Sequence, residues 1–157
     1  MKKKIKSIGE LTRIVTLLKK EGKKIVFTNG CFDIIHSGHI KLLRKSKSLG
    51  NILIVGLNSD RSIKRIKDKS RPINRAHDRA FVLSSIDVVD FVTIFNESTP
   101  EKTIKSLSPD VLVKGGDWKK KEIVGSEFVL KNGGKVVSVK FVKGYSTSDL
   151  IKRLKNG

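Results

Sequence analysis

Cysteine is nearly absent from this chain of 157 residues, because Cys31 is the only one. A single cysteine excludes an internal disulfide and agrees with a protein that works in the reducing cytoplasm. Long hydrophobic runs are also missing, and none approaches the roughly 18–20 residues needed to cross a bilayer. The N-terminal segment MKKKIKSIGEL is basic but has no apolar core or small-residue cleavage site, so it is not expected to be a signal peptide. We therefore expect a cytoplasmic protein with no membrane partner.

Acidic residues are scarce as well, with 15 of them against 34 lysines and arginines, for a net charge of +19. Such a balance fits either an anionic partner or a lysine-rich surface that only contacts water. The lysines are spread along the chain and hardly interleaved with aromatic residues, since tryptophan and tyrosine occur once each. We find no nucleic-acid-binding motif. The pattern favours the solvated surface, and no nucleic-acid partner is expected.

Apolar strand-like runs alternate with amphipathic helix-like runs along the chain. Strands are expected at residues 24–28, 52–57, 91–95, 111–113 and 136–139. Helices are expected at residues 7–20, 37–49, 60–67, 75–85, 99–107, 127–132 and 146–154. Ser37 is the expected N-cap of the second helix, and Pro100 is expected at the first position of the fifth. The pattern predicts an α/β fold with a five-stranded parallel sheet covered on both faces. The length fits one domain over residues 1–157, with a core at 23–154 and an N-terminal helix at 7–20.

The segment NGCFDIIHSGH at residues 29–39 is the most informative part of the chain. It holds two of the three histidines, His36 and His39, in a His-x-Gly-His tetrapeptide between the first strand and the second helix. A helix that begins after a glycine-bearing turn presents backbone N–H groups to an anion. The two imidazoles could donate hydrogen bonds to a reacting phosphate. Two alternatives are a structural polar pair and a metal site that includes Cys31, although no fourth ligand is adjacent.

The other polar clusters also follow predicted strands: NSD at 58–60, KGGDW at 114–118 and YSTS at 145–148. Ligands of open parallel sheets bind outside the carboxyl ends of the strands, where the strand order switches. We therefore expect one composite site. The chain contains neither a P-loop motif nor a Gly-x-Gly-x-x-Gly motif, so phosphate binding must depend on the His-x-Gly-His helix start.

Simpler roles remain open for several of these residues. Asp33 could hold a Mg²⁺–phosphate group or form only a local turn, and Cys31 fits packing better than nucleophilic attack. Ser146 could cap the last helix, and KGGDW could be an ordinary glycine turn. The basic loop at 67–75 and its flanks could form an anion clamp or a solvated face. Its candidate cations are Lys64, Arg65, Lys67, Lys69, Arg71 and Arg75.

These segments together resemble the cytidylyltransferase-like nucleotidyltransferase superfamily, and within it the adenylyltransferases that form ADP-heptose from D-glycero-β-D-manno-heptose 1-phosphate. The likeness covers about residues 8–154 and depends on an ordered set of segments. They read FTNGCFDIIHSGH, LNSD, SRPIN, SPDVLVKGGDW, EIVGSEFV, NGGKVV and YSTSDLIKR. The resemblance implies a Rossmann-like three-layer fold and a Mg²⁺-dependent reaction between ATP and a sugar 1-phosphate, with Mg²⁺ bound through the triphosphate and no direct protein ligand.

The resemblance also implies roles for single residues. His36 and His39 are expected to contact the nucleotide phosphates and stabilise the transition state, and Lys47 to neutralise the triphosphate. A second group is expected to bind the nucleotide: Cys31, Phe32, Gly115, Ser146, Thr147 and Ser148. A third group is expected to bind the sugar phosphate: Asp33, Lys114 and Asp117. The resemblance further implies a homodimer and a separate heptose kinase that supplies the substrate.

The final segment departs from the family at Tyr145, where relatives commonly have a small or aliphatic residue. Tyr145 would alter how the base or ribose packs. Two other functions stay open at this point. One is a related nucleotidyltransferase such as a glycerol-3-phosphate cytidylyltransferase. The other is a nucleic-acid-binding module without turnover, which the net charge suggests.

Overall fold

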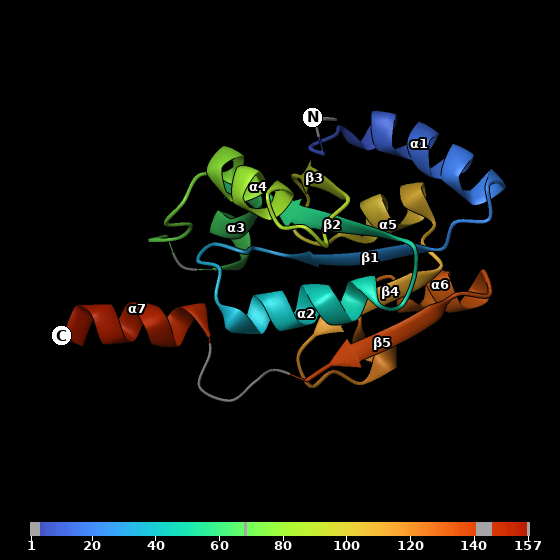
Figure 1. The fold of residues 1–157 in the computed structure, drawn as a ribbon. Helices are drawn as coiled ribbons and strands as arrows, with labels where there is room; N and C mark the ends of the chain where they lie inside the picture. The colour runs from blue at the N-terminus through green and yellow to red at the C-terminus, as the bar shows by residue number, and fades with distance from the viewer. Residues whose placement is uncertain (1–3, 68, 141–145, 157) are drawn as a thin grey trace.

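Five parallel strands form the centre of the molecule, as the sequence predicts. The computed structural model describes residues 4–67, 69–140 and 146–156. The strands are β1 Ile25–Gly30, β2 Ile52–Asn58, β3 Phe91–Phe95, β4 Val111–Gly115 and β5 Lys135–Val139. They lie in the order β3-β2-β1-β4-β5, and every pairing is parallel (Figure 1). The strand order therefore switches direction between β1 and β4, where a ligand site is expected.

Helices cover both faces of this sheet, which makes the fold a three-layer α/β structure of the Rossmann-like type. They are α1 Ile8–Lys20, α2 Ser37–Lys47, α3 Asp60–Ile66, α4 Ala76–Ser84, α5 Glu101–Leu107, α6 Ser126–Lys131 and α7 Thr147–Asn156, with a 3₁₀ turn η1 at Lys120–Glu122. Among the described residues, none of these helices is both long enough and apolar enough to cross a membrane.

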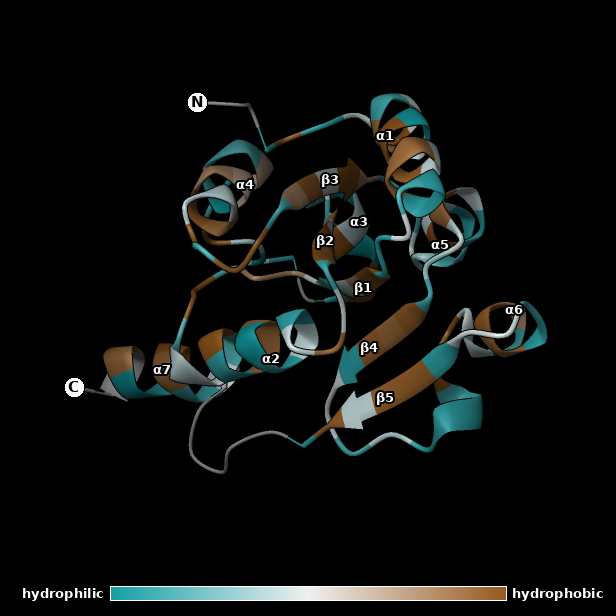
Figure 2. Cartoon of the chain, turned by 45° about the vertical axis from the view of Figure 1, so that its right-hand side comes forward, coloured by the Kyte–Doolittle hydropathy of each residue, from teal (hydrophilic) through white to brown (hydrophobic). Residues whose placement is uncertain are grey.

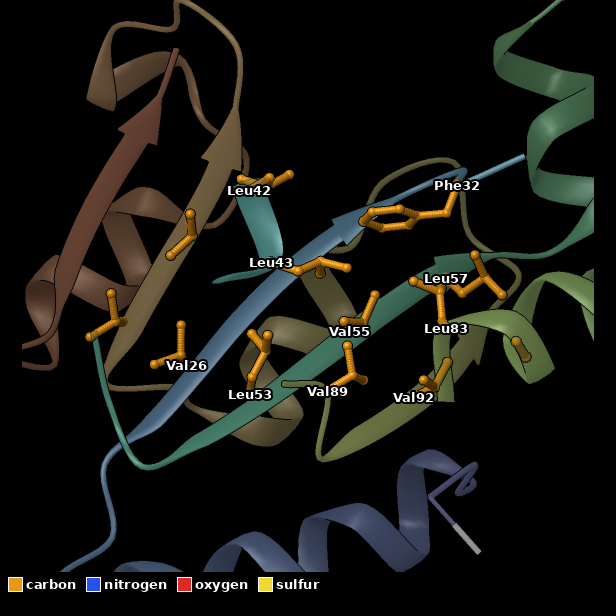
Figure 3. Packing of buried hydrophobic residues seen from close by; sticks show 13 residues of the cluster. Val26, Phe32, Leu42, Leu43, Leu53, Val55, Leu57, Leu83, Val89 and Val92 are labelled. Atoms are coloured by element: carbon orange, nitrogen blue, oxygen red, sulfur yellow. The ribbon is translucent and has the colours of Figure 1, made fainter. Parts of the chain in front are cut away.

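The hydrophobic core has two halves, one on each face of the sheet. On one face, Leu43 of α2 and Leu83 of α4 pack on Val55 and on the other strand side chains that point to this face (Figure 3). On the other face, α1, α5 and α6 pack on the alternate side chains, among them Phe27 and Ile54. Because strand residues alternate between faces, the apolar strands buried on both sides supply both halves. Figure 2 shows the strands mainly in brown and the helices in bands of teal and brown.

Two helix starts differ from the sequence-based prediction by one residue. His36, not Ser37, is the N-cap of α2, and its backbone is extended at φ −140° and ψ 171°. Pro100 is the N-cap of α5 and not its first helical residue. The first shift matters for function, because it places one motif histidine at the N-cap and the other at the third helical position. Helix α1 begins as expected, with a reciprocal capping box between Ser7 and Glu10.

Candidate active site

A pocket of about 700 Å³ opens at the carboxyl ends of the strands, next to the β1–β4 switch point. This volume suits a small-molecule ligand. Most of the residues predicted for binding or catalysis line the pocket, although they come from three separate segments of the chain. They are Cys31, Phe32, Asp33, His36, His39, Lys114, Gly115, Ser146, Thr147 and Ser148. The fold thus brings the predicted segments together in one composite site.

The two motif histidines lie against each other at the start of α2. Their ring centroids are 3.9 Å apart with an interplanar angle of 32°. The His36 backbone N–H donates a hydrogen bond to His39 Nδ1 at 3.4 Å. Burial, and then the neighbouring His36, lowers the pKa of His39 to about 4, and burial also lowers the pKa of His36. Both rings are therefore neutral at pH 7, and they act as hydrogen-bond donors, not as cations.

The proton of His39 must lie on Nε2, because Nδ1 already accepts a hydrogen bond. His36 differs, since its Nδ1 is buried and has no hydrogen-bond partner among the described residues. An unpaired buried nitrogen in a pocket wall is costly unless a ligand contacts it. Neutral imidazoles at a helix start, with the donor of His39 fixed on Nε2, are suited to bind phosphate oxygens.

Phe32 shapes the turn that carries these histidines. Its φ of 44° lies in the left-handed region, which costs a non-glycine residue about 1–2 kcal/mol. Its ring is buried and lies 5.1 Å from the His39 ring. A Cβ at Gly30 would come within 3.0 Å of the Phe32 ring, so a glycine is needed at the end of β1. The strained turn therefore holds the aromatic ring against the side of His39.

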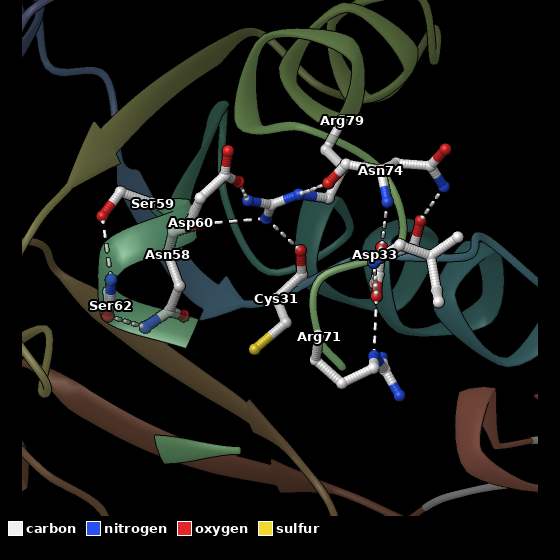
Figure 4. A network of polar contacts seen from close by, with 10 residues as sticks. Cys31, Asp33, Asn58, Ser59, Asp60, Ser62, Arg71, Asn74 and Arg79 are labelled. Atoms are coloured by element: carbon white, nitrogen blue, oxygen red, sulfur yellow. Dashed lines mark hydrogen bonds and ion pairs between the residues drawn. The ribbon is translucent and has the colours of Figure 1, made fainter. Parts of the chain in front are cut away.

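Asp33 holds the following loop in place. Its carboxylate is 1% exposed and accepts hydrogen bonds from the Ile73 and Asn74 backbone N–H groups. It also accepts one from Arg71 Nε at 2.8 Å, and Asn74 Nδ2 donates to the Asp33 carbonyl (Figure 4). Both carboxylate oxygens are thus already engaged. The prediction that Asp33 binds the substrate directly does not fit this geometry, because the side chain is occupied by the loop.

Arg79 is the largest buried polar side chain near the site, and the sequence-based prediction missed it. Its guanidinium donates hydrogen bonds to the carbonyls of Cys31 at 2.6 Å, Asn58 at 2.9 Å and Asn74 at 2.9 Å. It also pairs with Asp60 at 2.7 Å (Figure 4). One side chain from α4 thereby ties together the ends of β1 and β2 and the loop before α4. A signal was present in the sequence, because Arg79 occupies the apolar stripe of α4.

Three cations line the other part of the pocket, and their charges reach the thiol of Cys31. They are Lys67, Arg71 and Lys114. Burial raises the pKa of Cys31, and the three cations together with Arg79 oppose this shift. Burial lowers the pKa of Lys114, and the charge of Lys67 adds to the effect. Among the described residues no carboxylate pairs with Lys67 or Lys114, so an anionic ligand would relieve their repulsion.

The start of α7 forms a further wall of the pocket. The Ser146 hydroxyl donates to Asp149 Oδ2 at 2.7 Å and accepts from the Asp149 backbone N–H at 3.0 Å. Thr147 Oγ1 contacts the Ile34 carbonyl at 3.3 Å and thereby anchors α7 beside α2 (Figure 1). Ser148 lines the pocket. The expected role of Tyr145 falls outside the described residues.

Two predicted site residues lie outside the pocket. Lys47 is at the last turn of α2, about 15 Å from its start by the rise of 1.5 Å per residue. There it forms an ion pair with Asp90 and donates to the Asn51 carbonyl at 2.6 Å. Lys47 therefore lies near the amino-terminal ends of the strands and away from the pocket, so this geometry does not support the expected contact with the triphosphate. Asp117 is exposed and does not line the pocket, so its predicted substrate contact is not supported either.

Other pocket residues had no predicted role. Trp118 lines the pocket, and its ring Nε1–H donates to the Gly115 carbonyl at 3.2 Å. Ser98, Thr99 and Pro100 follow β3, and Ile123 and Val124 follow η1. The apolar residues among them carry no chemistry that a sequence pattern could reveal. Trp118 could have been predicted as a site residue, because it is the only tryptophan and stands in the KGGDW segment, but no role was assigned to it.

Mg²⁺ was expected to bind through the triphosphate. No group of three or more His, Cys, Asp or Glu side chains within the described ranges could hold a metal ion. The Asp33 carboxylate is engaged by loop donors, as described above. Mg²⁺ binding through the triphosphate stays a prediction.

The parallel sheet, the strand order and a histidine pair at a helix start are typical of the α/β nucleotidyltransferase fold. Comparison with known proteins agrees with this class. Residues 27–153 match the Cytidylyltransferase-like family model, and the chain belongs to that family.

Relatives share about half of its residues. The chain is 54% identical over 154 residues to the Bifunctional protein HldE of Campylobacter jejuni subsp. jejuni serotype O:6. It is 51% identical over 152 residues to the Bifunctional protein HldE of Nitratiruptor sp.. These alignments cover 98% and 97% of this chain but 32% of each relative. The chain thus spans about a third of the length of the curated relatives it matches.

Solved structures give the same picture. The lipopolysaccharide core biosynthesis protein from Thermoplasma volcanium is 33% identical with a TM-score of 0.62. That alignment covers 80% of this chain and 100% of the other. Pantoate-beta-alanine ligase from Francisella tularensis shares the fold, with a TM-score of 0.64 and 18% identity over 96% of this chain and 76% of the other.

Proposed function

We propose that this protein transfers AMP from ATP to D-glycero-β-D-manno-heptose 1-phosphate and releases pyrophosphate and ADP-heptose. The observation that carries the reaction type is the pair of neutral histidines at the start of α2, inside a pocket at the switch point of the sheet. The choice of sugar is supported by the ordered segments that resemble ADP-heptose-forming enzymes and by the similarity to a lipopolysaccharide core biosynthesis protein.

The chain's own residues supply positioning and hydrogen bonds, and no protein nucleophile is needed. An oxygen of the sugar phosphate attacks the α-phosphorus of ATP, and the bond to the bridging oxygen of pyrophosphate breaks. His39 Nε2–H and the backbone N–H groups at the start of α2 would stabilise the charge that develops on phosphate oxygens. Mg²⁺ bound by the triphosphate would neutralise part of the same charge. The cationic wall formed by Lys67, Arg71 and Lys114 would attract the second anion.

The partners follow from this reaction. ATP and a sugar 1-phosphate are the substrates, and a separate heptose kinase would provide the sugar 1-phosphate. We expect the reaction to take place in the cytoplasm, where ATP is supplied. A homodimer is expected from the family likeness, and light scattering of the purified protein would measure its mass.

The test is pyrophosphate release by the purified protein with Mg²⁺, each of ATP, CTP, GTP and UTP, and either β-heptose 1-phosphate or glycerol 3-phosphate. Release with ATP and heptose phosphate alone, with ADP-heptose identified by mass spectrometry, is the expected result. Release with CTP and glycerol phosphate would overturn the substrates but keep the reaction type. Absence of release from every pair, together with salt-sensitive nucleic-acid binding, would favour a module without turnover.

A further inference from the structure

Arg71 has an unusual environment for a cation in a loop. Its side chain is 11% exposed, although most of the neighbouring loop residues are exposed. Its Nε–H donates to the buried Asp33 carboxylate at 2.8 Å, which is the normal length for a charge-assisted bond. Neither terminal guanidinium nitrogen has a hydrogen-bond partner in the part of the chain that the structure describes. Figure 4 shows this bond between the Arg71 side chain and Asp33.

The pairing with Asp33 fixes the direction of the guanidinium. Asp33 belongs to the same turn as Cys31 and Phe32, so it is positioned by the end of β1. The Asp33 carboxylate also accepts hydrogen bonds from the backbone N–H groups of Ile73 and Asn74, which hold the loop directly after Arg71. Arg71 lines the pocket. A guanidinium fixed through Nε keeps four N–H donors in one plane for a ligand, an arrangement that suits two oxygens of a phosphate.

We propose that Arg71 binds the phosphate of the acceptor sugar, and that Asp33 acts as a positioning residue through Arg71. This inference rests on the proposed function. A forked donor engages two oxygens of a phosphate monoester and leaves the third free to attack the nucleotide. Lys67 and Lys114 lie on the same cationic side of the pocket. The imidazoles and the hydroxyls of α7 are left for the nucleotide, so the two anions have separate binding groups.

The experiment compares Arg71→Gln, Arg71→Lys and a matched control, Arg75→Gln, in steady-state kinetics with ATP and β-heptose 1-phosphate. Arg75 belongs to the same basic loop, but its side chain is exposed and it does not line the pocket. We expect Arg71→Gln to raise the KM for the sugar phosphate on the order of 10- to 100-fold, as for loss of charged hydrogen bonds. The KM for ATP should change less than about threefold, and Arg75→Gln should behave like the wild type. Arg71→Lys should recover only part of the affinity, because an ammonium cannot reproduce the fork.

Asp33→Asn tests the positioning role by a double-mutant cycle. We expect it to raise the KM for the sugar phosphate and to leave the KM for ATP nearly unchanged. The double variant Asp33→Asn/Arg71→Gln should have the same KM for the sugar phosphate as Arg71→Gln alone, because both changes remove the same interaction. Additive effects, or equal increases in both KM values, would indicate general disorder of the loop and overturn the inference. Circular dichroism and thermal melting check that each variant folds.

The outcomes separate this inference from the proposed function. A wild type that forms no ADP-heptose overturns both. An active wild type in which Arg71→Gln matches Arg75→Gln overturns the inference alone. A rise in the KM for ATP only would indicate that Arg71 contacts the nucleotide and not the sugar phosphate, and it would also overturn the inference. Isothermal titration of β-heptose 1-phosphate into each variant provides a binding measurement that does not depend on turnover.

Discussion

The backbone N–H of His36 donates a hydrogen bond to Nδ1 of His39 at 3.4 Å, and this contact determines which nitrogen of His39 carries the proton. Because Nδ1 is the acceptor, Nε2 holds the hydrogen. The low pKa of His39, about 4, keeps the ring neutral over the physiological range. The histidine is therefore a hydrogen-bond donor of fixed orientation, which suits stabilisation of charge on a reacting phosphate.

His39→Ala should lower turnover on the order of 10²–10³-fold while the protein still folds, as for loss of an oxyanion-hole donor. His39→Gln should retain more activity, because its amide N–H can reach the position of Nε2. The measurement is kcat for pyrophosphate release, with circular dichroism as the folding control. Normal turnover in a folded His39→Ala variant would contradict the proposed mechanism.

Stability should fall in acid partly because of His39. Its pKa is about 4 in the folded protein and about 6.5 when unfolded. Below pH 6.5 the imidazole of the unfolded chain binds a proton more readily than that of the folded protein. The contribution of His39 to the free energy of unfolding is therefore present above pH 6.5 and is lost as the pH falls towards 4. Urea unfolding at pH 7.5 and pH 5 should show a smaller loss of unfolding free energy for His39→Gln than for the wild type. Equal losses would show that His39 is not the titrating group.

Arg79→Ala should destabilise the protein by about 3 kcal/mol, because it leaves one buried and two partly buried carbonyls without their donor. Arg79→Lys should recover little, since an ammonium cannot reach carbonyls from three segments at once. Asp60→Asn is the control, with an expected cost below about 1 kcal/mol, because the Asp60 side chain is 38% exposed. Urea unfolding measures all three, and a loss for Arg79→Ala no larger than for Asp60→Asn would argue against the network.

Lys47→Met tests the correction to the predicted site. Its ion pair with Asp90 is partly exposed on both sides, so we expect a loss of about 1 kcal/mol in unfolding free energy. Both KM values and kcat should stay within about twofold of the wild type, because Lys47 lies near the amino-terminal ends of the strands and away from the pocket. A large increase in the KM for ATP would restore the original prediction that Lys47 contacts the triphosphate.

Cys31 should be an unreactive thiol despite its place in the pocket. Burial raises its pKa, and only the thiolate reacts with alkylating agents. At pH 7.5 iodoacetamide should modify Cys31 more slowly than it modifies free cysteine, and ATP should slow the reaction further. Mass spectrometry follows the reaction, with unfolded protein in urea as the control. Faster modification than free cysteine would point to an activated nucleophile.

Much of the fold could be predicted from local pattern. The buried strand Ile52–Asn58 is apolar almost throughout, and the amphipathic stripe of α1 ends at a glycine, so both elements were expected close to their observed bounds. The position of His36 and His39 after the first strand likewise implied an anion site. Helix starts were less certain, because the choice between His36 and Ser37 as N-cap depends on a backbone angle that composition does not determine.

The sequence by itself determined the alternation of strands and helices, the parallel sheet and the histidine pair at a helix start, because these depend on periodicity and on neighbouring residues. Only the tertiary structure decided which charged side chains face the pocket. Arg71 lies in the pocket wall and Arg79 is buried beside it, held by partners 38 and 48 residues away, whereas Lys47 lies away from the pocket and pairs with Asp90. A charged side chain takes the partner that the packing brings near it, and that partner is remote in the sequence.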